Sequence, residues 1–333
     1  MPKYDFITLG GTTEDITVFT DEGVIIENKD NILQQRLFAF EYGAKIKVDQ
    51  AYSTFGGGAS NAAVCLSRLD FKTAAMVAVG DDERGQRIMT NFIEHNVSTS
   101  LMQVIKKNST GFSFLLVGQE HEHVVFSNRA ANEKLKITPA QVRDLDCAKW
   151  VYMTSLSGKW QSVLNNVFKT KAKIAWNPGH IQLHAGFSKI GKYLAKTEVL
   201  SVNQDEAIEL VVTNPKYKNK SLKFLNNIKN LLFLIKDCGP KIVLITRGHD
   251  GADAYDGEKY YHQDILNEKT RVDTTGVGDA FGSTFVAGLK FFDGDIQKSL
   301  YLSSKNTASV IAEQGAQNGL LTKRQILRGI KQI

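Results

Sequence analysis

The sequence contains few cysteines, and their positions exclude two common kinds of structural site. Only three occur among 333 residues, at Cys65, Cys147 and Cys238. Their number is odd and no two have the spacing of metal ligands, so neither a disulfide framework nor a zinc site is predicted. This cysteine usage fits a reducing compartment, and we expect a cytoplasmic protein.

Long apolar segments are also absent. The longest apolar run, residues 231–235, is far too short to cross a bilayer. The chain begins almost directly with a strand-like segment at residues 6–9, and no apolar region of a signal peptide precedes it. We therefore expect no membrane partner.

Three common enzyme motifs are missing. The sequence has neither the G-x-x-x-x-G-K-[ST] phosphate loop nor the G-x-S-x-G turn of α/β-hydrolases. Gly276, Gly278 and Gly282 miss the dinucleotide fingerprint G-x-G-x-x-G by one residue, and they lie near the C-terminus. A dehydrogenase is therefore disfavoured.

Charge and histidine patterns give no clear sign of a nucleic acid or metal partner. The net charge of +6 is mild at this length, and no nucleic-acid motif accompanies the lysines of residues 216–229. His180 and His184 are four residues apart, but no acidic third ligand follows at a fixed spacing. We expect no nucleic acid partner and no metal at these histidines.

Apolar, strand-like segments alternate with helix-length segments through most of the chain. Alternation of this kind is typical of a parallel sheet that is covered by helices on both faces. The sequence therefore predicts an α/β fold with a doubly wound, mostly parallel sheet. The strands of this sheet are expected at residues 6–9, 74–79, 149–153, 173–176, 198–202 and 241–246.

Residues 18–54 follow a different pattern. Short alternating segments at 24–26, 37–42 and 44–48 have no helical period, so they are predicted to be strands of a small separate sheet. Later strands are candidates to join it. We expect an α/β domain of residues 1–16, 56–110 and 131–333, and a small discontinuous β domain of residues 17–55 and 111–130.

The stretch RVDTTGVGDAF, residues 271–281, carries the strongest chemical signal. Its glycines let backbone amides approach a ligand, and the helix predicted after it adds unpaired amides and a partial positive charge. An aspartate in such a site would repel the anion, so its presence indicates a chemical role such as taking a proton. We therefore predict phosphoryl transfer, with Asp279 as general base and the amides of residues 276–278 facing the phosphate.

Two earlier segments could hold a substrate hydroxyl. Asp15 follows the first strand, at the edge where open α/β sheets bind ligands, although a turn or cap role is equally good. The glycines of residues 56–58 open a helix with Asn61 in its first turn. Such small residues indicate close approach by a ligand or by another backbone, and packing explains them about as well.

Two further segments could serve a metal and a nucleotide. Asn203 and Glu206 begin a predicted helix on one face, where they could orient the waters of a Mg²⁺ ion. A helix start with Glu206 as capping partner is the alternative. Thr246 and Gly248 lie in a loop after an apolar strand, which suits a nucleotide but also an ordinary turn.

In combination, these segments resemble the ribokinase-like (PfkB-type) carbohydrate kinases. Residues 273–279, DTTGVGD, are similar to that family's C-terminal signature D-T-x-G-x-G-D. Residues 56–61, GGGASN, are similar to its N-terminal glycine signature, and residues 203–206 match N-x-x-E. Order and spacing agree along essentially the whole chain. The resemblance implies a doubly wound α/β domain with a small β lid.

The resemblance also implies an activity and the residues that carry it. The γ-phosphoryl group of ATP would pass to a hydroxyl of a sugar or nucleoside, with Mg²⁺ and a monovalent cation such as K⁺ as candidate cofactors. The implied catalytic residues are Asp279, Gly276, Val277 and Gly278. The implied acceptor residues are Asp15, Gly56, Gly57, Asn61 and Asn132. The implied nucleotide and metal residues are Asn203, Glu206, Thr246, Gly248, Asn306 and Gly315, with Glu206 reaching the metal through water.

The sequence departs from the family in places. Gly58 stands where ribokinase proper has a lysine, which weakens ribose as the acceptor. Arg247 stands where the family often has a small residue. Arg129 precedes an Ala-Ala-Asn element near the expected acceptor. An arginine there could suit an acidic or phosphorylated sugar, or close a salt bridge of the lid.

We therefore predict an ATP-dependent kinase of a small sugar or sugar derivative. Phe38, Phe40 and Tyr42 motivate the first alternative, a nucleoside kinase, because a base could stack on an aromatic side chain of the lid. The second alternative is a catalytically silent sugar-binding regulator, which the intact base and anion site disfavour. The apolar face of the lid is a candidate surface for a homodimer.

Overall fold

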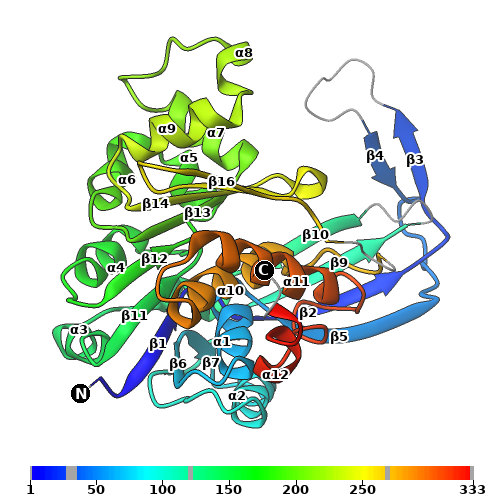
Figure 1. Ribbon diagram of the computed structural model, residues 1–333. Helices are drawn as coiled ribbons and strands as arrows, with labels where there is room; N and C mark the ends of the chain where they lie inside the picture. The colour runs from blue at the N-terminus through cyan, green and yellow to red at the C-terminus, as the bar shows by residue number, and fades with distance from the viewer. Residues whose placement is uncertain (1, 28–35, 119–122, 267–270, 331–333) are drawn as a thin grey trace.

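An eight-stranded sheet forms the centre of the molecule (Figure 1). The computed structural model describes residues 2–27, 36–118, 123–266 and 271–330. The six strands from β14 to β6 in the sheet run parallel, and β15 and β16 are antiparallel to their neighbours. In spatial order the strands are β16 (Tyr260–Gln263), β15 (Ala252–Tyr255), β14 (Ile242–Thr246), β13 (Val199–Asn203), β12 (Lys173–Trp176), β11 (Ala148–Met153), β1 (Tyr4–Leu9) and β6 (Thr73–Met76).

Helices cover both faces of this sheet, and each face has its own apolar core. Successive strand residues point to opposite faces, so Ile7 packs in one core and its neighbour Phe6 in the other. One face carries α3 (Pro139–Leu145), α4 (Trp160–Val167), α5 (His180–His184), α6 (Phe187–Leu194), α7 (Gln204–Val212), α8 (Leu222–Leu225) and α9 (Ile228–Lys236). The other carries α1 (Gly58–Arg68), α2 (Glu83–Glu94), α10 (Val277–Phe291), α11 (Ile296–Val310) and α12 (Lys323–Ile326). The predicted fold class is confirmed.

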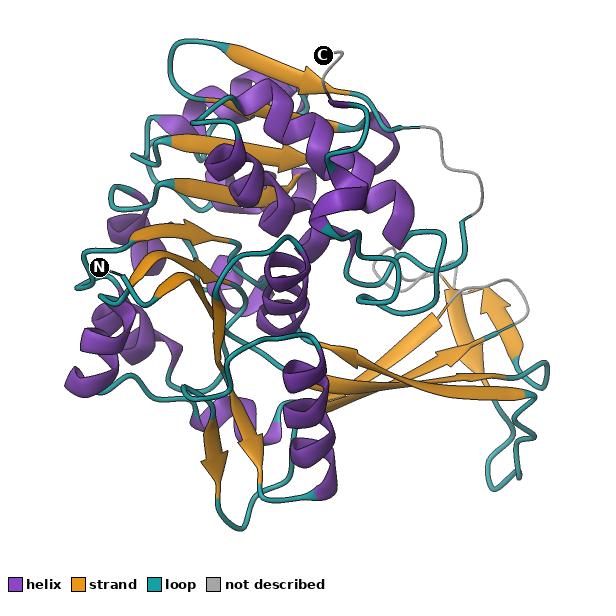
Figure 2. Cartoon of the chain, turned by 60° about the horizontal axis from the view of Figure 1, so that its bottom comes forward, coloured by secondary structure: helices purple, strands orange, loops and turns teal. Residues whose placement is uncertain are grey.

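A second, four-stranded sheet projects from this α/β body (Figures 1 and 2). Its order is β10 (His123–Asn128), β9 (Phe112–Val117), β2 (Thr13–Phe19) and β5 (Gln50–Gly56). β2 follows β1 after a short connection, and β5 leads directly into α1. Both connections therefore join the projecting sheet to the body at the same place, where they border the candidate site described below.

Two small pairs of strands complete the described structure. β3 (Val24–Glu27) pairs with β4 (Arg36–Ala39), and β7 (Ala78–Gly80) pairs with β8 (Gln103–Ile105). Two short 3₁₀ helices, η1 (Ala130–Lys134) and η2 (Gly248–Asp250), follow β10 and β14. Within the described ranges, every helix is too short or too polar to span a membrane.

Three local predictions were wrong. The strand expected at residues 44–48 is irregular and mostly exposed, and the paired strand begins later, at Gln50. The strand expected at residues 74–79 is split, because β6 ends at Met76 in the main sheet and β7 begins at Ala78 and pairs with β8 instead. The segment expected as one strand at 37–42 ends at Ala39.

The three aromatic residues that could stack on a base lie in different surroundings. Phe38 and Phe40 contact each other edge to face, with ring centroids 4.8 Å apart. Tyr42 lies beyond the end of β4 and is fully exposed. The three rings therefore do not alternate along one face of a single strand.

Candidate active site

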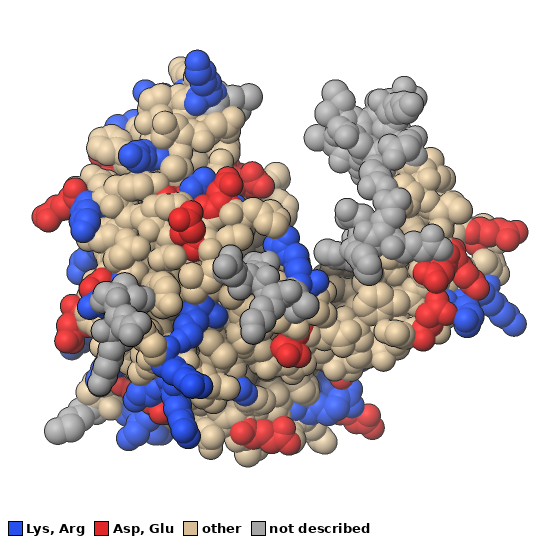
Figure 3. Space-filling model, turned by 45° about the vertical axis from the view of Figure 1, so that its right-hand side comes forward, with Lys and Arg blue, Asp and Glu red and all other residues tan. Residues whose placement is uncertain are grey.

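Three cavities meet at the first turn of α10, beyond the carboxyl ends of the main strands. The Asp15 cavity has a volume of about 290 Å³ and lies between the body and the projecting sheet, where Figure 3 shows the molecule hollowed. The Glu206 cavity (about 200 Å³) and the Phe281 cavity (about 150 Å³) lie on the body itself. Asp279 borders the first two cavities, and Gly278 borders the last two. This edge of an open α/β sheet is where ligands bind.

The start of α10 presents free amides to these cavities. Gly276 caps the helix with φ of 73°, and a Cβ there would lie 2.2 Å from the Cβ of Ala316, so the position requires glycine. A Cβ on Gly278 would meet nothing within 4 Å, which means that open space lies before this turn. In the described chain, no group accepts a hydrogen bond from the amides of Gly278 or Asp279. The turn is therefore free to bind an anion.

Asp273 fixes the loop that leads into this helix. Its carboxylate accepts hydrogen bonds from the amides of Thr275 and Gly315, both at 2.8 Å. The first aspartate of the DTTGVGD stretch thus has a structural role, because it joins two loop segments by hydrogen bonds. Gly315, which was expected at the nucleotide, instead anchors this loop and packs against Thr54, so the structure does not bring it to the Phe281 cavity.

Asp279 faces Asn61 across the gap between α10 and α1. The Asn61 Nδ2 donates to the Asp279 Oδ2 at 2.8 Å. Burial raises the pKa of Asp279 to about 6, the hydrogen bond from Asn61 opposes that rise, and the charge of Asp15 adds to it. A carboxyl group with this pKa is mostly ionised near neutral pH and can still accept a proton. Asn61, expected to bind an acceptor hydroxyl, also holds the expected base.

The glycine-rich turn allows both carboxylates to approach α1. A Cβ on Gly56 would lie 1.9 Å from the Asp15 Oδ2, and one on Gly58 would lie 2.9 Å from the Asp279 Oδ1. Gly57 has φ of 87° and packs on the backbone of Gly11. Of the reasons expected for these glycines, close approach of another backbone holds for Gly57, while Gly56 and Gly58 make room for carboxylates that border the cavity.

Asp15 lies on β2, between the projecting sheet and the body. Burial raises the pKa of Asp15, and a hydrogen bond from the Thr13 Oγ1, at 3.0 Å, opposes that rise. The positive charge of Arg129, which lines the same cavity, also lowers the pKa of Asp15. No described residue forms a hydrogen bond or an ion pair with the Arg129 guanidinium, so this cation is available to a ligand.

Asn132 lines the Asp15 cavity but already uses its amide. Its Oδ1 accepts from the Thr12 amide at 3.0 Å, and its Nδ2 donates to the Thr12 carbonyl at 2.8 Å. Asn132 thus fixes the connection between β1 and β2, which carries Asp15. Asn132 lines the cavity expected to hold the acceptor, but its side-chain hydrogen bonds go to the protein backbone.

Asn203 and Glu206 form a capping box at the start of α7. The Asn203 Oδ1 accepts from the Glu206 amide at 2.8 Å, and the Glu206 Oε2 accepts from the Asn203 amide at 2.9 Å. Both residues also line the Glu206 cavity, opposite the first turn of α10. Burial raises the pKa of Glu206. The capping box uses only the Oε2 of Glu206, so the Oε1 is left to orient the waters of a hydrated Mg²⁺. The predicted roles in capping and in metal binding are therefore compatible.

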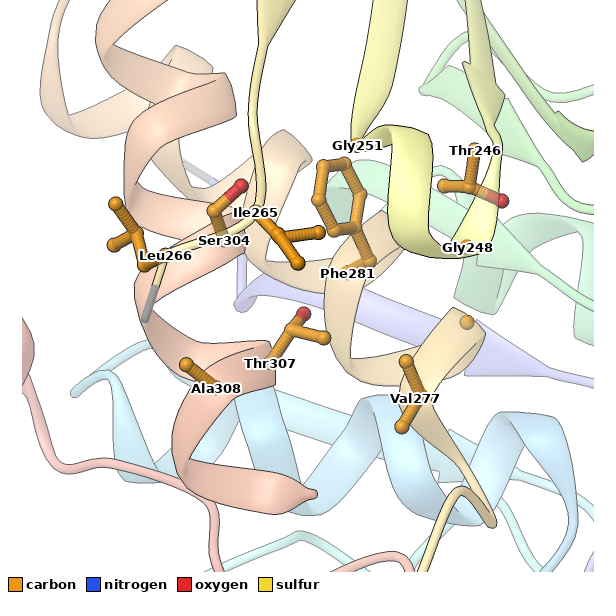
Figure 4. Close-up of a pocket in the computed structure, with 11 residues that line it drawn as sticks. Thr246, Gly248, Gly251, Ile265, Leu266, Val277, Phe281, Ser304, Thr307 and Ala308 are labelled. Atoms are coloured by element: carbon orange, nitrogen blue, oxygen red, sulfur yellow. The ribbon is translucent and has the colours of Figure 1, made fainter. Parts of the chain in front are cut away.

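Mostly apolar groups line the Phe281 cavity, together with a few polar side chains (Figure 4). Phe281 of α10, Ile265 and Ala308 of α11 supply apolar surface. Thr246 and Gly248, the two residues expected at the nucleotide, line it at the η2 turn. A mostly apolar cavity with a few polar groups is typical of a site for a small organic ligand.

Arg247 holds the η2 turn in place. Its Nε donates at 2.6 Å to Asp253, whose side chain is fully buried on β15. Asp253 also accepts from Tyr260 and contacts His262 at 2.7 Å. The unusual arginine is therefore an anchor for the loop that lines the Phe281 cavity.

Comparison with known proteins identifies the family. The description "pfkB family carbohydrate kinase" matches residues 28–323. The chain belongs to the pfkB family of carbohydrate kinases. It is 25% identical to the ATP-dependent 6-phosphofructokinase of Thermoanaerobacterium thermosaccharolyticum over 81% of this chain and 85% of that protein.

Solved structures of low sequence identity share the fold of this kinase. Arabidopsis thaliana ribokinase complexed with ribose and ATP superposes with a TM-score of 0.80, at 18% identity, over 98% of this chain and 99% of that chain. The Burkholderia thailandensis nucleoside kinase in complex with inosine gives a TM-score of 0.76 at 15% identity, over 98% of each chain. The ribokinase-like fold predicted from the sequence is confirmed.

Asn306 is a second expected nucleotide residue that does not line the Phe281 cavity. Asn306 is fully buried, and its Nδ2 donates to the Thr284 Oγ1 at 2.8 Å while its Oδ1 accepts from the Leu321 amide at 2.9 Å. Both ends of the amide are thus used inside the core. Its neighbours Ser304 and Thr307 line the Phe281 cavity instead, because they lie on the other side of α11.

The histidine pair has an acidic neighbour that the sequence did not indicate. Glu209 of α7 lies beside His180 and His184, and one ligand atom from each lies within 4.8 Å of the others. Both histidines are exposed, and His184 already contacts Glu209 at 3.5 Å. Helix packing creates this group, because Glu209 is distant in sequence.

Other cavity residues were missed by the sequence analysis. Ser155 and Ser157 line the Asp15 cavity directly after β11. The rule that ligands bind at the carboxyl ends of parallel strands could have indicated them. Ser113 and Ser127 come from the projecting sheet and carried no recognisable signal.

Proposed function

We propose that this pfkB-family protein transfers the γ-phosphoryl group of ATP to a hydroxyl of a small sugar or sugar derivative. The supporting observation is the first turn of α10, where Asp279 borders the Asp15 cavity and the Glu206 cavity together. In this proposal the acceptor occupies the Asp15 cavity, the phosphates lie along the Glu206 cavity, and the adenine enters the Phe281 cavity. The apolar walls of the last suit a nucleobase.

In the proposed reaction, Asp279 takes the proton of the acceptor hydroxyl. A bond forms between that oxygen and the γ-phosphorus, and the bond from the γ-phosphorus to the oxygen bridging it to the β-phosphate breaks, so that ADP leaves. The amides of residues 276–278 form the anion hole for the negative charge on the transferring group. Asp15, Gly57 and Asn61 are proposed to position the acceptor, together with Gly56 and Asn132, which hold Asp15 and its connection in place.

Mg²⁺ is the proposed metal, and Asn203 and Glu206 are the residues that would hold it through its waters. When bound, it would neutralise charge on the nucleotide phosphates. The capping box orients both side chains toward the cavity without engaging the second carboxylate oxygen of Glu206. A requirement for a monovalent cation such as K⁺ is a separate prediction, to be tested by replacing K⁺ in the assay.

The projecting four-stranded sheet is proposed to act as a lid. It contributes Ser113, Val125 and Ser127 to the Asp15 cavity, so its closure over the acceptor would exclude water and limit ATP hydrolysis. The lid is proposed to comprise residues 17–55 and 111–130, and the body the remaining segments. Val124 and Phe126 are exposed apolar residues on one face of β10, and they make this sheet the proposed surface of a homodimer. A cytoplasmic location is also proposed.

Arg129 bears on the kind of acceptor. It is the cationic side chain among the described residues that line the Asp15 cavity, and it has no partner there. A phosphate or carboxylate on the acceptor would provide one. The related 6-phosphofructokinase makes phosphorylated sugars a necessary part of any substrate test.

The test is an ADP-release assay with neutral sugars, phosphorylated sugars, sugar acids and nucleosides. We expect release with at least one sugar class, and a rate at least about 100-fold lower with the Asp279→Asn variant. Turnover of nucleosides alone would favour the alternative of a nucleoside kinase, for which the fold of the Burkholderia thailandensis enzyme is the precedent. Binding of sugars without ADP release from any of them would favour a silent regulator and contradict the proposal.

A further inference from the structure

A chain of three buried amide side chains ends on the proposed base. Asn91 of α2 donates through its Nδ2 to the Gln317 Oε1, at 3.0 Å. Gln317, in the segment after α11, donates through its Nε2 to the Asn61 Oδ1, also at 3.0 Å. Asn61 then donates to the Asp279 Oδ2 at 2.8 Å. Gln317 and Asn61 each accept with the oxygen and donate with the nitrogen, so the chain has one direction.

These three amides are shielded from water. Asn91 is 5% exposed, Gln317 is 6% exposed and Asn61 is 4% exposed. Buried amides need their hydrogen bonds, because an unpaired one costs free energy. Neither Asn91 nor Gln317 lines the Asp15 cavity or the Glu206 cavity, so contact with a ligand does not account for them.

The direction of the chain decides which atom of Asn61 faces the carboxylate. If the Asn61 amide were rotated by half a turn, its oxygen would face Asp279, and two acceptors would oppose each other. Gln317 prevents that rotation, because its amino group requires the Asn61 oxygen as acceptor. The Gln317 Nε2 also lies 3.2 Å from the Ser60 Oγ, which fixes its position further.

We propose that Gln317 is a positioning residue, which keeps the Asn61 amide directed at Asp279 and thereby sets the pH range in which Asp279 accepts a proton. Asn91 supports it by fixing the Gln317 oxygen. This inference rests on the proposed kinase function, but it concerns residues outside the cavities. It also explains why a segment far from the DTTGVGD stretch in sequence contributes to the site.

The Gln317→Glu variant tests the proposal with almost no change of shape. The ionised glutamate offers only acceptors in place of the amino donor, so it competes with Asp279 for the Asn61 amino group and also adds a negative charge nearby. Loss of a hydrogen bond to an ionised carboxylate raises its pKa. We expect the acidic limb of the kcat/KM profile to move up by about one pH unit or more, while the KM for ATP stays unchanged.

The matched control is Gln314→Glu. Gln314 is exposed and lies three residues earlier in the same segment, so this variant makes the same chemical change outside the chain of amides. Among the described residues, the other charged or titratable groups that act on Asp279 or line its two cavities are Asp15, Tyr152, Arg129 and Glu206, and both variants leave them in place. We expect a wild-type pH profile for the control.

A second variant and a second readout keep the test decisive. Gln317→Met removes the donor without adding charge, and serves if Gln317→Glu does not fold. The ¹³C resonance of the Asp279 carboxyl, assigned by its absence from Asp279→Asn, reports the titration without turnover. An unchanged resonance and an unchanged acidic limb in Gln317→Glu would overturn the inference. Wild-type protein that turns over no acceptor would contradict the proposed function instead, and the resonance would still decide the role of Gln317.

Discussion

Replacement of Gly56 by alanine should damage acceptor binding through Asp15. The new Cβ would lie 1.9 Å from the Asp15 Oδ2, whereas ordinary contacts begin at 3.4 Å. The carboxylate must therefore move by about 1.5 Å, which also breaks its 3.0 Å hydrogen bond with Thr13. Forced overpacking costs about 1–3 kcal/mol of folding free energy. Misplacement by about 1 Å in a reacting site can reduce rates on the order of 100-fold.

The expected outcome for Gly56→Ala is therefore specific. The KM for the acceptor should rise and its kcat/KM should fall on the order of 100-fold, while the KM for ATP changes little because the Phe281 cavity is intact. Steady-state kinetics with each substrate varied in turn would measure this. The melting temperature should fall by a few degrees.

A remote glycine provides the control. A Cβ on Gly191 of α6 would lie 2.7 Å from the ring of Phe187, on the side of the molecule that packs away from the cavities. Gly191→Ala therefore imposes a similar clash without touching Asp15, and both KM values should stay at wild-type levels. If Gly56→Ala also kept wild-type kinetics, the role assigned to Asp15 would be wrong.

Three further predictions follow from the charges of the site. The folded-state pKa of Asp279, about 6, lies above that of a free aspartate, so the stability contributed by this group is lost as pH rises from about 4 to 6. The free energy of unfolding of Asp279→Asn should therefore exceed that of the wild type by about 1–3 kcal/mol at pH 8 and by little at pH 4. Thermal unfolding at both pH values measures this difference. Glu206→Gln preserves the capping box, because glutamine also caps, so the melting temperature should stay unchanged. The Mg²⁺ concentration needed for half-maximal rate should rise roughly 10- to 100-fold. An unchanged Mg²⁺ requirement would mean that Glu206 serves only as a cap. Arg129→Gln should raise the KM of a phosphorylated or carboxylated acceptor about 10-fold or more, and it should leave the KM of a neutral sugar nearly unchanged. Equal effects on both KM values would argue that Arg129 acts on the lid.

Segments with strong periodicity were predictable from the sequence. β11, β12 and β14 lie within one residue of their expected bounds, because buried parallel strands are continuous apolar runs between clear helices. The helix after the DTTGVGD stretch was also expected, because a segment with helical apolar periodicity directly follows the glycines of that stretch. The candidate residues Asp15, Asn61 and Asp279 border one cavity, as the rule for strand ends implies.

Features that depend on packing between distant segments were not predictable. β2 follows a strand of the main sheet but pairs with β5 and β9, and only the tertiary structure determines that choice of partners. The family resemblance placed Asn306 at the nucleotide, yet the hydroxyl of Thr284 and the amide of Leu321 bind its side chain within the core. The contact of Gln317 with Asn61 joins residues far apart in sequence, and no local pattern marks it.

The rate of phosphoryl transfer by Asp279→Asn tests the central claim most directly. Asparagine keeps the size of the side chain and can still accept the hydrogen bond from Asn61, so the fold and the binding of MgATP should persist. With the best acceptor from the panel, kcat should fall by about 10²- to 10⁴-fold, the usual contribution of a general base. Transfer at the wild-type rate would contradict the account, because Asp279 would then not be the group that takes the proton.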